Sequence, residues 1–172
     1  MSSKRTLSFI STFIFCFIIW IGLTLTFNYQ EIIGGLLVSF VVALVSNKFF
    51  IHENALYLFS PVKIFYLLAY TPLFIKELIK ANIDVAKRSF NPELPINPGI
   101  VKVPTDMTSE YGLAMLCNSI TLTPGTISMD IVDEEGRNYI YIHWIDVQSM
   151  DPVQAGNMIK GSLESGVRRI WK

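Results

Sequence analysis

The chain has 172 residues, of which 51% are hydrophobic, and its mean hydropathy of +0.43 is high for a soluble domain of this size. Its net charge is zero, but residues 1–90 carry eight cations and four carboxylates, whereas residues 91–172 carry six cations and ten carboxylates. This asymmetry is typical of a membrane protein with an acidic cytoplasmic part, and it argues against nucleic-acid binding, which needs a basic face. The two cysteines, Cys16 and Cys117, fall in an apolar segment and a predicted soluble helix, so no disulfide framework is expected.

The first apolar segment, residues 7–27, contains no charge. As a helix it is roughly 31 Å long, close to the thickness of a bilayer core. Lys4 and Arg5 precede it and predict a cytoplasmic amino terminus. A cleaved signal peptide is the alternative, but the run is long for one and residues 28–31 offer no small-residue cleavage site. We therefore expect a membrane anchor.

The second apolar segment, residues 32–51, follows after four polar residues and must return antiparallel to the first. Lys48 can extend its ammonium group to the membrane interface. Gly34, Gly35 and Ala43 allow another helix to approach closely. Residues 1–52 are thus predicted to form a transmembrane hairpin with both ends in the cytoplasm. His52 is expected at the interface.

Residues 60–90 predict an amphipathic helix. Ser60 suits the N-cap and Pro61 the first helical position. The uncharged run 64–75 is short for a span, and crossing the membrane would place four cations outside. We expect the helix to lie on the cytoplasmic membrane surface with a kink at Pro72, and a third span is the alternative. Its predicted apolar stripe comprises Ile64, Leu67, Leu68, Ile75, Leu78, Ile79 and Ala86, with Lys76, Lys80, Lys87 and Arg88 off the stripe and Lys80–Asp84 and Asp84–Arg88 pairs at i,i+4.

Residues 91–98 contain three prolines and predict an extended linker. A small cytoplasmic domain follows over residues 99–172. It is predicted to begin with a strand over 99–103, which Pro104 ends, and a helix over 110–121 capped from within residues 105–109. Pro124-Gly125 then predicts a turn in which glycine takes a positive φ.

In the second half of this domain, Ile127, Met129 and Ile131 alternate with polar residues, as in a half-buried strand. Residues 133–137 predict a hairpin loop and residues 139–144 its partner strand. Asp151 and Pro152 begin a closing helix, and its apolar face is predicted to comprise Ala155, Ile159, Leu163 and Ile170. The fold class is a membrane α-helical hairpin plus an amphipathic helix, followed by a small α+β sandwich of order β-α-β-β-α with its helices on one face.

We assign no catalytic, cofactor-binding or metal-binding residue. The acidic group Asp130, Asp133, Glu134 and Glu135 matches no calcium loop and is interpreted as a solvated hairpin tip. A lone His143 in a strand is more often structural than a ligand, and Cys117 has no cationic neighbour in sequence that would lower its pKa. Thr123-Pro124-Gly125-Thr126 has one glycine and fits a turn better than a phosphate-binding loop. No Asp, Glu, Arg or His lies within either membrane segment, so this chain alone does not look like a pore or a pump.

The run Ile120-Thr121-Leu122-Thr123-Pro124-Gly125-Thr126, followed by Ser128-Met129-Asp130-Ile131 and Tyr141-Ile142-His143-Trp144-Ile145-Asp146, resembles the E subunit of the multisubunit Mrp/Mnh Na+/H+ antiporters of bacteria. Lys80-Ala81-Asn82-Ile83-Asp84 fits that family's pattern too. The resemblance implies an accessory, structural subunit of a hetero-oligomeric complex in the cytoplasmic membrane. Such a complex exchanges Na+ for H+, and larger subunits move the ions. The expected partners are the other subunits and membrane lipid.

Two other classes stay open on the residues alone. One is a membrane-tethered ligand sensor, for which a soluble fragment of residues 91–172 would bind a small molecule. The other is a transporter that acts without companions and would move ions in liposomes by itself.

Overall fold

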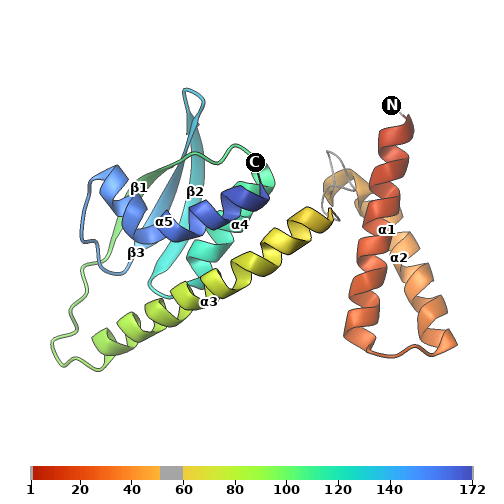
Figure 1. Ribbon diagram of the computed structural model, residues 1–172, viewed down its shortest axis with the longest axis horizontal. Helices are drawn as coiled ribbons and strands as arrows, with labels where there is room; N and C mark the ends of the chain where they lie inside the picture. The colour runs from red at the N-terminus through yellow and green to blue at the C-terminus, as the bar shows by residue number, and fades with distance from the viewer. Residues whose placement is uncertain (1, 51–59, 172) are drawn as a thin grey trace. The chain divides into compact units, whose positions relative to one another are not determined.

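The computed structural model describes residues 2–50 and 60–171. The chain divides into two compact units, Met1–Ile64 and Phe65–Lys172, and each is described by itself. Figure 1 shows the helices of the first unit and the mixed helix and sheet layers of the second. The predicted helix over 60–90 and the predicted domain over 99–172 fall mainly in the second unit.

Over residues 2–50, the first unit contains two packed helices, α1 (Ser2–Thr24) and α2 (Tyr29–Phe50). The two helices approach closely at Gly35, where a Cβ atom would lie 2.5 Å from the Trp20 ring. The Trp20 indole also donates a hydrogen bond to the carbonyl of Glu31 at 3.0 Å, which ties the end of α1 to the start of α2. The predicted close helix approach at Gly35 is confirmed.

Large apolar side chains on the outside of this pair are exposed, among them Ile18, Leu23, Leu37 and Val41. Over residues 2–50 and 60–171, none of the helices is both long enough and apolar enough to pass as a membrane-spanning segment. The predicted segments 7–27 and 32–51 coincide largely with α1 and α2, and their crossing of a membrane stays a prediction. Residue 51 and His52 lie outside the described residues.

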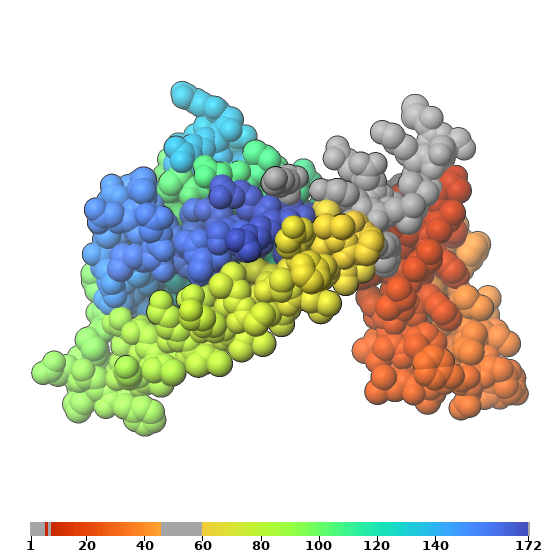
Figure 2. All heavy atoms as spheres, viewed as in Figure 1, coloured from red at the N-terminus to blue at the C-terminus, as the bar shows by residue number. Residues whose placement is uncertain are grey.

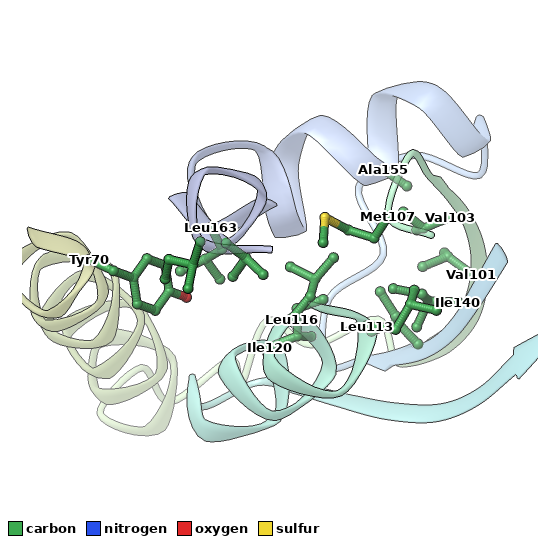
Figure 3. Packing of buried hydrophobic residues seen from close by; sticks show 13 residues of the cluster. Tyr70, Val101, Val103, Met107, Leu113, Leu116, Ile120, Ile140, Ala155 and Leu163 are labelled. Carbon is green, nitrogen blue, oxygen red and sulfur yellow. The ribbon is translucent and has the colours of Figure 1, made fainter. Parts of the chain in front are cut away.

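The second unit contains a three-stranded antiparallel sheet of order β1-β3-β2, formed by β1 (Gly99–Thr105), β2 (Thr126–Glu134) and β3 (Arg137–Trp144). Two further helices, α4 (Glu110–Leu122) and α5 (Pro152–Ile170), complete the predicted β-α-β-β-α order and pack on the sheet. The strands, helices and hairpin loop predicted for this domain are therefore confirmed within a few residues. Its core, shown in Figure 3, comprises Val101, Val103, Met107, Leu113, Leu116, Ile120, Ile140, Ile142, Ala155, Leu163, Val167 and Ile170, with Tyr70 added from α3.

The starts of α4 and α5 follow from their capping residues. The Ser109 side chain accepts a hydrogen bond from the amide of Gly112, and Asp151 accepts from the amides of Val153 and Gln154. These side chains satisfy amide groups that have no partner in the first turn of a helix. Asp151 was predicted as an N-cap, and Ser109 lies within the range 105–109 that was predicted to supply the other.

Two details of the sheet differ from the predictions. Strand β1 does not end at Pro104 but continues to Thr105, because β1 is an edge strand, where proline is tolerated. The predicted burial of Ile127, Met129 and Ile131 is wrong: their exposed fractions are 53%, 57% and 39%.

These three residues are exposed because the neighbouring residue Ser128 faces the helices. The amide of Ser128 donates to the Thr121 hydroxyl, and the Ser128 hydroxyl donates to the carbonyl of Cys117, so Ser128 turns toward α4. A β-bulge between Ser128 and Asp130 then shifts the register against β3. Polar contacts with α4 thus decide which side of β2 faces the helices.

Helix α3 (Pro61–Ser89) begins one residue after Ser60, as predicted, and Pro72 lies inside it. Tyr70 is buried against the core, and Leu73 and Phe74 pack beside it. The Tyr70 hydroxyl donates to the Ser119 hydroxyl of α4 at 2.8 Å. Figure 1 shows α3 running past α4 and α5. Most of the predicted apolar stripe faces away from the core and is exposed, namely Ile64, Leu67, Leu68, Ile75 and Ile79.

The ion pairs on α3 match the predictions in part. Arg88 pairs with Asp84, as expected. Lys80 pairs with Glu77 at 3.9 Å rather than with Asp84. The Asp84 carboxylate instead pairs with the guanidinium of Arg88 at 2.8 Å.

Candidate functional site

The segment Thr123–Thr126 joins the end of α4 to β2, and its two threonines close the helix. The hydroxyl groups of Thr123 and Thr126 each donate to the carbonyl of Ile120 at 2.7 Å. Carbonyl groups in the last turn of a helix have no partner within the helix, so these hydroxyls stabilise its end. The motif is therefore a C-terminal cap for α4 as well as a turn.

Gly125 has a φ of +98°, so the predicted positive φ is confirmed. Its carbonyl accepts a hydrogen bond from the amide of Ile145 at 2.8 Å. A Cβ atom at this position would lie 3.1 Å from Cγ2 of Ile145 and 3.5 Å from Cγ2 of Val85 on α3. The backbone conformation therefore favours glycine, and any side chain here would also force Ile145 to shift by a few tenths of an ångström. The motif thus brings together the end of α4, the segment after β3, and α3.

Arg88 fastens α3 to the same region. Its guanidinium lies 2.8 Å from the Asp84 carboxylate and 2.8 Å from the Asp146 carboxylate, and it donates to the carbonyl of Pro95 at 2.8 Å. The hydrogen bond to Asp84 is the main cause of a raised Arg88 pKa, and both carboxylates add to it. Sequence reasoning found the Asp84 contact from its helical spacing and missed Asp146, for which no local pattern exists.

The linker over residues 91–98 is joined to the domain at its end. The amide of Asn97 donates to the carbonyl of Ile145, and the amide of Val147 donates to the carbonyl of Asn97 at 2.8 Å. The Asn97 side chain also donates to the carbonyl of Val147. Residues 145–147 therefore connect the linker, Arg88 and the Gly125 turn.

A pocket of about 590 Å³ adjoins these contacts and is lined by α3, the 123–126 motif, residues 144–148 and α5. Four cations line it, Lys76, Lys80, Lys87 and Arg88, against the carboxylates of Glu77 and Asp84. Apolar residues of α3 and α5 also line it, among them Ile79, Ile83, Met158, Ile159 and Leu163. The pocket combines an apolar interior with a cationic side.

Of the residues that the sequence considered as possible sites, Thr123-Pro124-Gly125-Thr126 line this pocket, whereas the acidic hairpin tip, His143 and Cys117 are not among its lining residues. Asp133 accepts a hydrogen bond from the amide of Gly136, and Glu134 pairs with Lys102, so the acidic hairpin tip is held by local contacts. His143 lies opposite Ile100 and Ile127 on the sheet.

The Cys117 thiol is partly buried, and burial raises its pKa. Within the ranges that the structure describes, no group of three or more His, Cys, Asp or Glu residues is placed to hold a metal ion.

Comparison with known proteins identifies the family. The sequence profile of the Na+/H+ ion antiporter subunit family matches residues 13–170. The E subunit of the Na+/H+ antiporter of Alkalihalophilus pseudofirmus is 37% identical over 134 residues, covering 78% of this chain and 80% of that protein. The chain belongs to this antiporter subunit family. The E1 subunit of the Na+/H+ antiporter of Staphylococcus haemolyticus is 36% identical over 178 residues, covering 99% of this chain and 98% of that protein.

A solved structure is similar to nearly the whole subunit. It is described as the membrane-bound sulfane sulfur reductase, an archaeal respiratory membrane complex. One of its chains is 41% identical, with a TM-score of 0.79, and the similarity covers 95% of this chain and 99% of that chain.

The resemblance inferred from the residues around Thr123–Thr126 is thereby confirmed, and with it the expectation of an antiporter subunit that works with other subunits. The alternatives of a free-standing sensor and a lone transporter find no support in these relatives, whose names describe subunits.

Proposed function

We propose that this chain is an accessory, structural subunit of a multisubunit Na+/H+ antiporter, inserted in the cell membrane by its α1–α2 hairpin. The family match over residues 13–170 is the observation that carries the proposal. The assembly role fits the contacts of the Thr123–Thr126 motif, which hold elements together and present no catalytic group.

The surface of the helix pair supports insertion in the membrane. The exposed fraction is 55% for Ile18, 64% for Leu37 and 58% for Val41, and no charge occurs between residues 7 and 27. Exposed apolar side chains around a helix pair are stabilised by lipid or by partner helices. With Lys4 and Arg5 before the first segment, the amino terminus would face the cytoplasm.

We further propose that α3 contacts the membrane surface along its exposed apolar stripe. Ile64, Leu68 and Ile75 lie on one side of the helix by its 3.6-residue period, and all three are exposed. The opposite side packs on the core through Tyr70. An interfacial position would cover the free stripe without a third crossing.

Ion translocation would then belong to other subunits. Residues 7–27 and 32–47 contain no acidic or basic side chain, and groups that carry ions through a bilayer are usually ionisable. The chain would contribute assembly and stability instead of a conduction path.

The test is co-purification from native membranes through a tag on the full chain, followed by measurement of Na+/H+ exchange by the complex. Gly125→Val should lower the yield of assembled complex, because valine is strained at a positive φ and meets Ile145. The transport rate per assembled complex should not change. Gly161→Ala, in open space on α5, is the matched control and should leave the yield unchanged.

A normal yield of the Gly125→Val complex with lost transport would contradict the assembly role. Exchange of Na+ for H+ by the purified chain alone in liposomes would contradict the division of labour between subunits.

A second candidate function is a subunit of a respiratory membrane complex, of the kind represented by the archaeal sulfane sulfur reductase. The 41% identity and the coverage of 95% of this chain favour it. The same co-purification distinguishes the two: antiporter subunits alone support the first function, and co-purifying reductase subunits support the second.

A further inference from the structure

We propose that the pocket between α3 and α5 binds the phosphate-bearing headgroup of an anionic membrane lipid, with an acyl chain along the exposed apolar stripe of α3. The inference rests on the proposed membrane-surface position of α3 and adds a ligand to it.

Three cationic residues of α3 lie at one border of its exposed apolar stripe. With 3.6 residues per turn, Lys76, Lys80 and Lys87 lie between the exposed apolar stripe and the side that packs on the core. All three residues line the pocket, and all three are exposed. A helix at a membrane surface typically places cations at such a border, where they reach lipid phosphates.

The residues around the pocket carry more positive than negative charge. The lining includes four cations and two carboxylates, and Asp146, which pairs with Arg88 beside the lining, brings the local excess to one positive charge. Arg88 is held by Asp84 and Asp146, and Lys80 lies 3.9 Å from Glu77. The excess charge therefore resides mainly on Lys76 and Lys87, so the pocket favours an anion.

The apolar part of the pocket distinguishes a lipid from a free anion. Ile79, Ile83 and Met158 line the pocket and have exposed fractions of 54%, 50% and 53%. Ile79 continues into the stripe with Ile75, which is also exposed. A small anion would leave this surface in water, whereas an acyl chain would cover it. Figure 2 shows α3 and α5 on the same face of the second unit, with their atoms accessible from outside.

The pocket also adjoins the Thr123–Thr126 motif. Its lining includes Thr123, Gly125 and Thr126, together with Ile145. These residues fix the end of α4 to the segment after β3. A lipid bound there would contact both α3 and the motif, and would hold the domain at the membrane.

The test uses the purified full chain in detergent and native mass spectrometry. Phosphatidylglycerol, zwitterionic phosphatidylcholine and water-soluble glycerophosphate are added in turn. The expected result is one tightly held phosphatidylglycerol, with phosphatidylcholine and glycerophosphate bound about tenfold more weakly or less. In K76Q/K87Q the affinity for phosphatidylglycerol should fall by about tenfold or more, as expected for the loss of two cations near lipid phosphate.

The matched control is R137Q/R169Q, which removes the same charge from exposed residues outside the pocket. It should bind phosphatidylglycerol as the unaltered chain does. A second variant, Ile83→Ser, keeps all charges and should weaken phosphatidylglycerol binding while leaving the weak glycerophosphate binding unchanged.

Equal affinity for phosphatidylglycerol and phosphatidylcholine, or equal losses in K76Q/K87Q and R137Q/R169Q, would overturn the proposal. Glycerophosphate bound as tightly as the lipid would assign the pocket to a soluble phosphate compound and overturn the lipid assignment. Companion subunits are counted in tagged preparations from membranes in parallel. If companion subunits co-purify with the unaltered chain but the chain binds all three compounds equally, only the lipid site is overturned. If no companion subunits co-purify with the unaltered chain, the proposed function is overturned.

Discussion

The hydroxyl of Tyr70 on α3 donates a hydrogen bond to the hydroxyl of Ser119 on α4 at 2.8 Å, inside the core of the second unit. Ser119 in turn donates to the carbonyl of Met115, so each hydroxyl proton has an acceptor. Burial raises the Tyr70 pKa, and the hydrogen bond with Ser119 opposes that shift. Tyr70 thereby joins α3 to the sheet domain by apolar packing and by one polar contact.

Tyr70→Phe should lower the free energy of unfolding by about 1 kcal/mol, because it removes this hydrogen bond and keeps the ring. Tyr70→Ala should cost about 3–5 kcal/mol, because it also leaves a cavity. Urea unfolding of the full chain in detergent, followed by circular dichroism, measures both. Tyr66→Phe, at a more exposed position on the same helix, is the control. Equal effects at positions 66 and 70 would contradict the role of the buried contact.

Two glycines on α5 should respond in opposite directions to alanine. A Cβ atom at Gly166 would lie 2.6 Å from Tyr70 Cδ2 and 2.9 Å from Leu73 Cδ2, so Gly166→Ala should push α3 away and cost about 1–3 kcal/mol. Gly161 has open space at this position, and Gly161→Ala should stabilise the helix by up to about 1 kcal/mol. Urea unfolding of both variants tests this prediction. If both changes stabilised the chain, α3 would not pack against Gly166.

Asp146→Asn should loosen the contact between the linker and the domain. The change removes a charged partner of Arg88, and hydrogen bonds to charged groups contribute about 1.5–3 kcal/mol. Hydrogen exchange at the amides of Asn97 and Val147 measures the effect, since both are bonded across this contact, and exchange should become faster. Asp130→Asn, on the exposed part of β2, serves as the control. Unchanged exchange in Asp146→Asn would mean that the backbone bonds suffice without Arg88.

Stability should depend on pH through Glu164. Burial acts to raise the pKa of this carboxyl, but hydrogen bonds from Lys160 and Thr105 outweigh it, so its pKa is lowered in the folded chain. A carboxyl whose pKa is lowered by folding stabilises the fold fully above its unfolded pKa of about 4.3. That contribution is lost as the pH falls through the lower folded pKa.

Glu164→Gln should therefore reduce the free energy of unfolding at pH 7 by about 3 kcal/mol, because the buried Lys160 loses its partner. The deficit should shrink as the pH falls below about 4.3. Unfolding measured at both ends of this range gives the slope. Glu134→Gln, at an exposed pair, should change the slope little. A parallel pH dependence in Glu164→Gln and the unaltered chain would refute the assignment.

The sequence determined the features that depend on neighbours along the chain. Asp151 before Pro152 marks the start of α5, and Pro124-Gly125 marks the turn with a positive φ, because capping and turn formation involve residues a few positions apart. The family resemblance also came mainly from a continuous run, residues 120–126, so it could be recognised without knowledge of the fold.

The tertiary structure decided which sides of these elements are buried. Ile127 alternates with polar residues like a core position, yet it stays exposed because Ser128 bonds to α4. Arg88 pairs with Asp84 through helical spacing, but its contact with Asp146 depends on how α3 packs beside the segment after β3. The pocket has the same origin, since its lysines are adjacent on one helix and its other walls come from distant residues. Local patterns carry no information about such partners, because long-range packing selects among faces that are equally apolar in sequence.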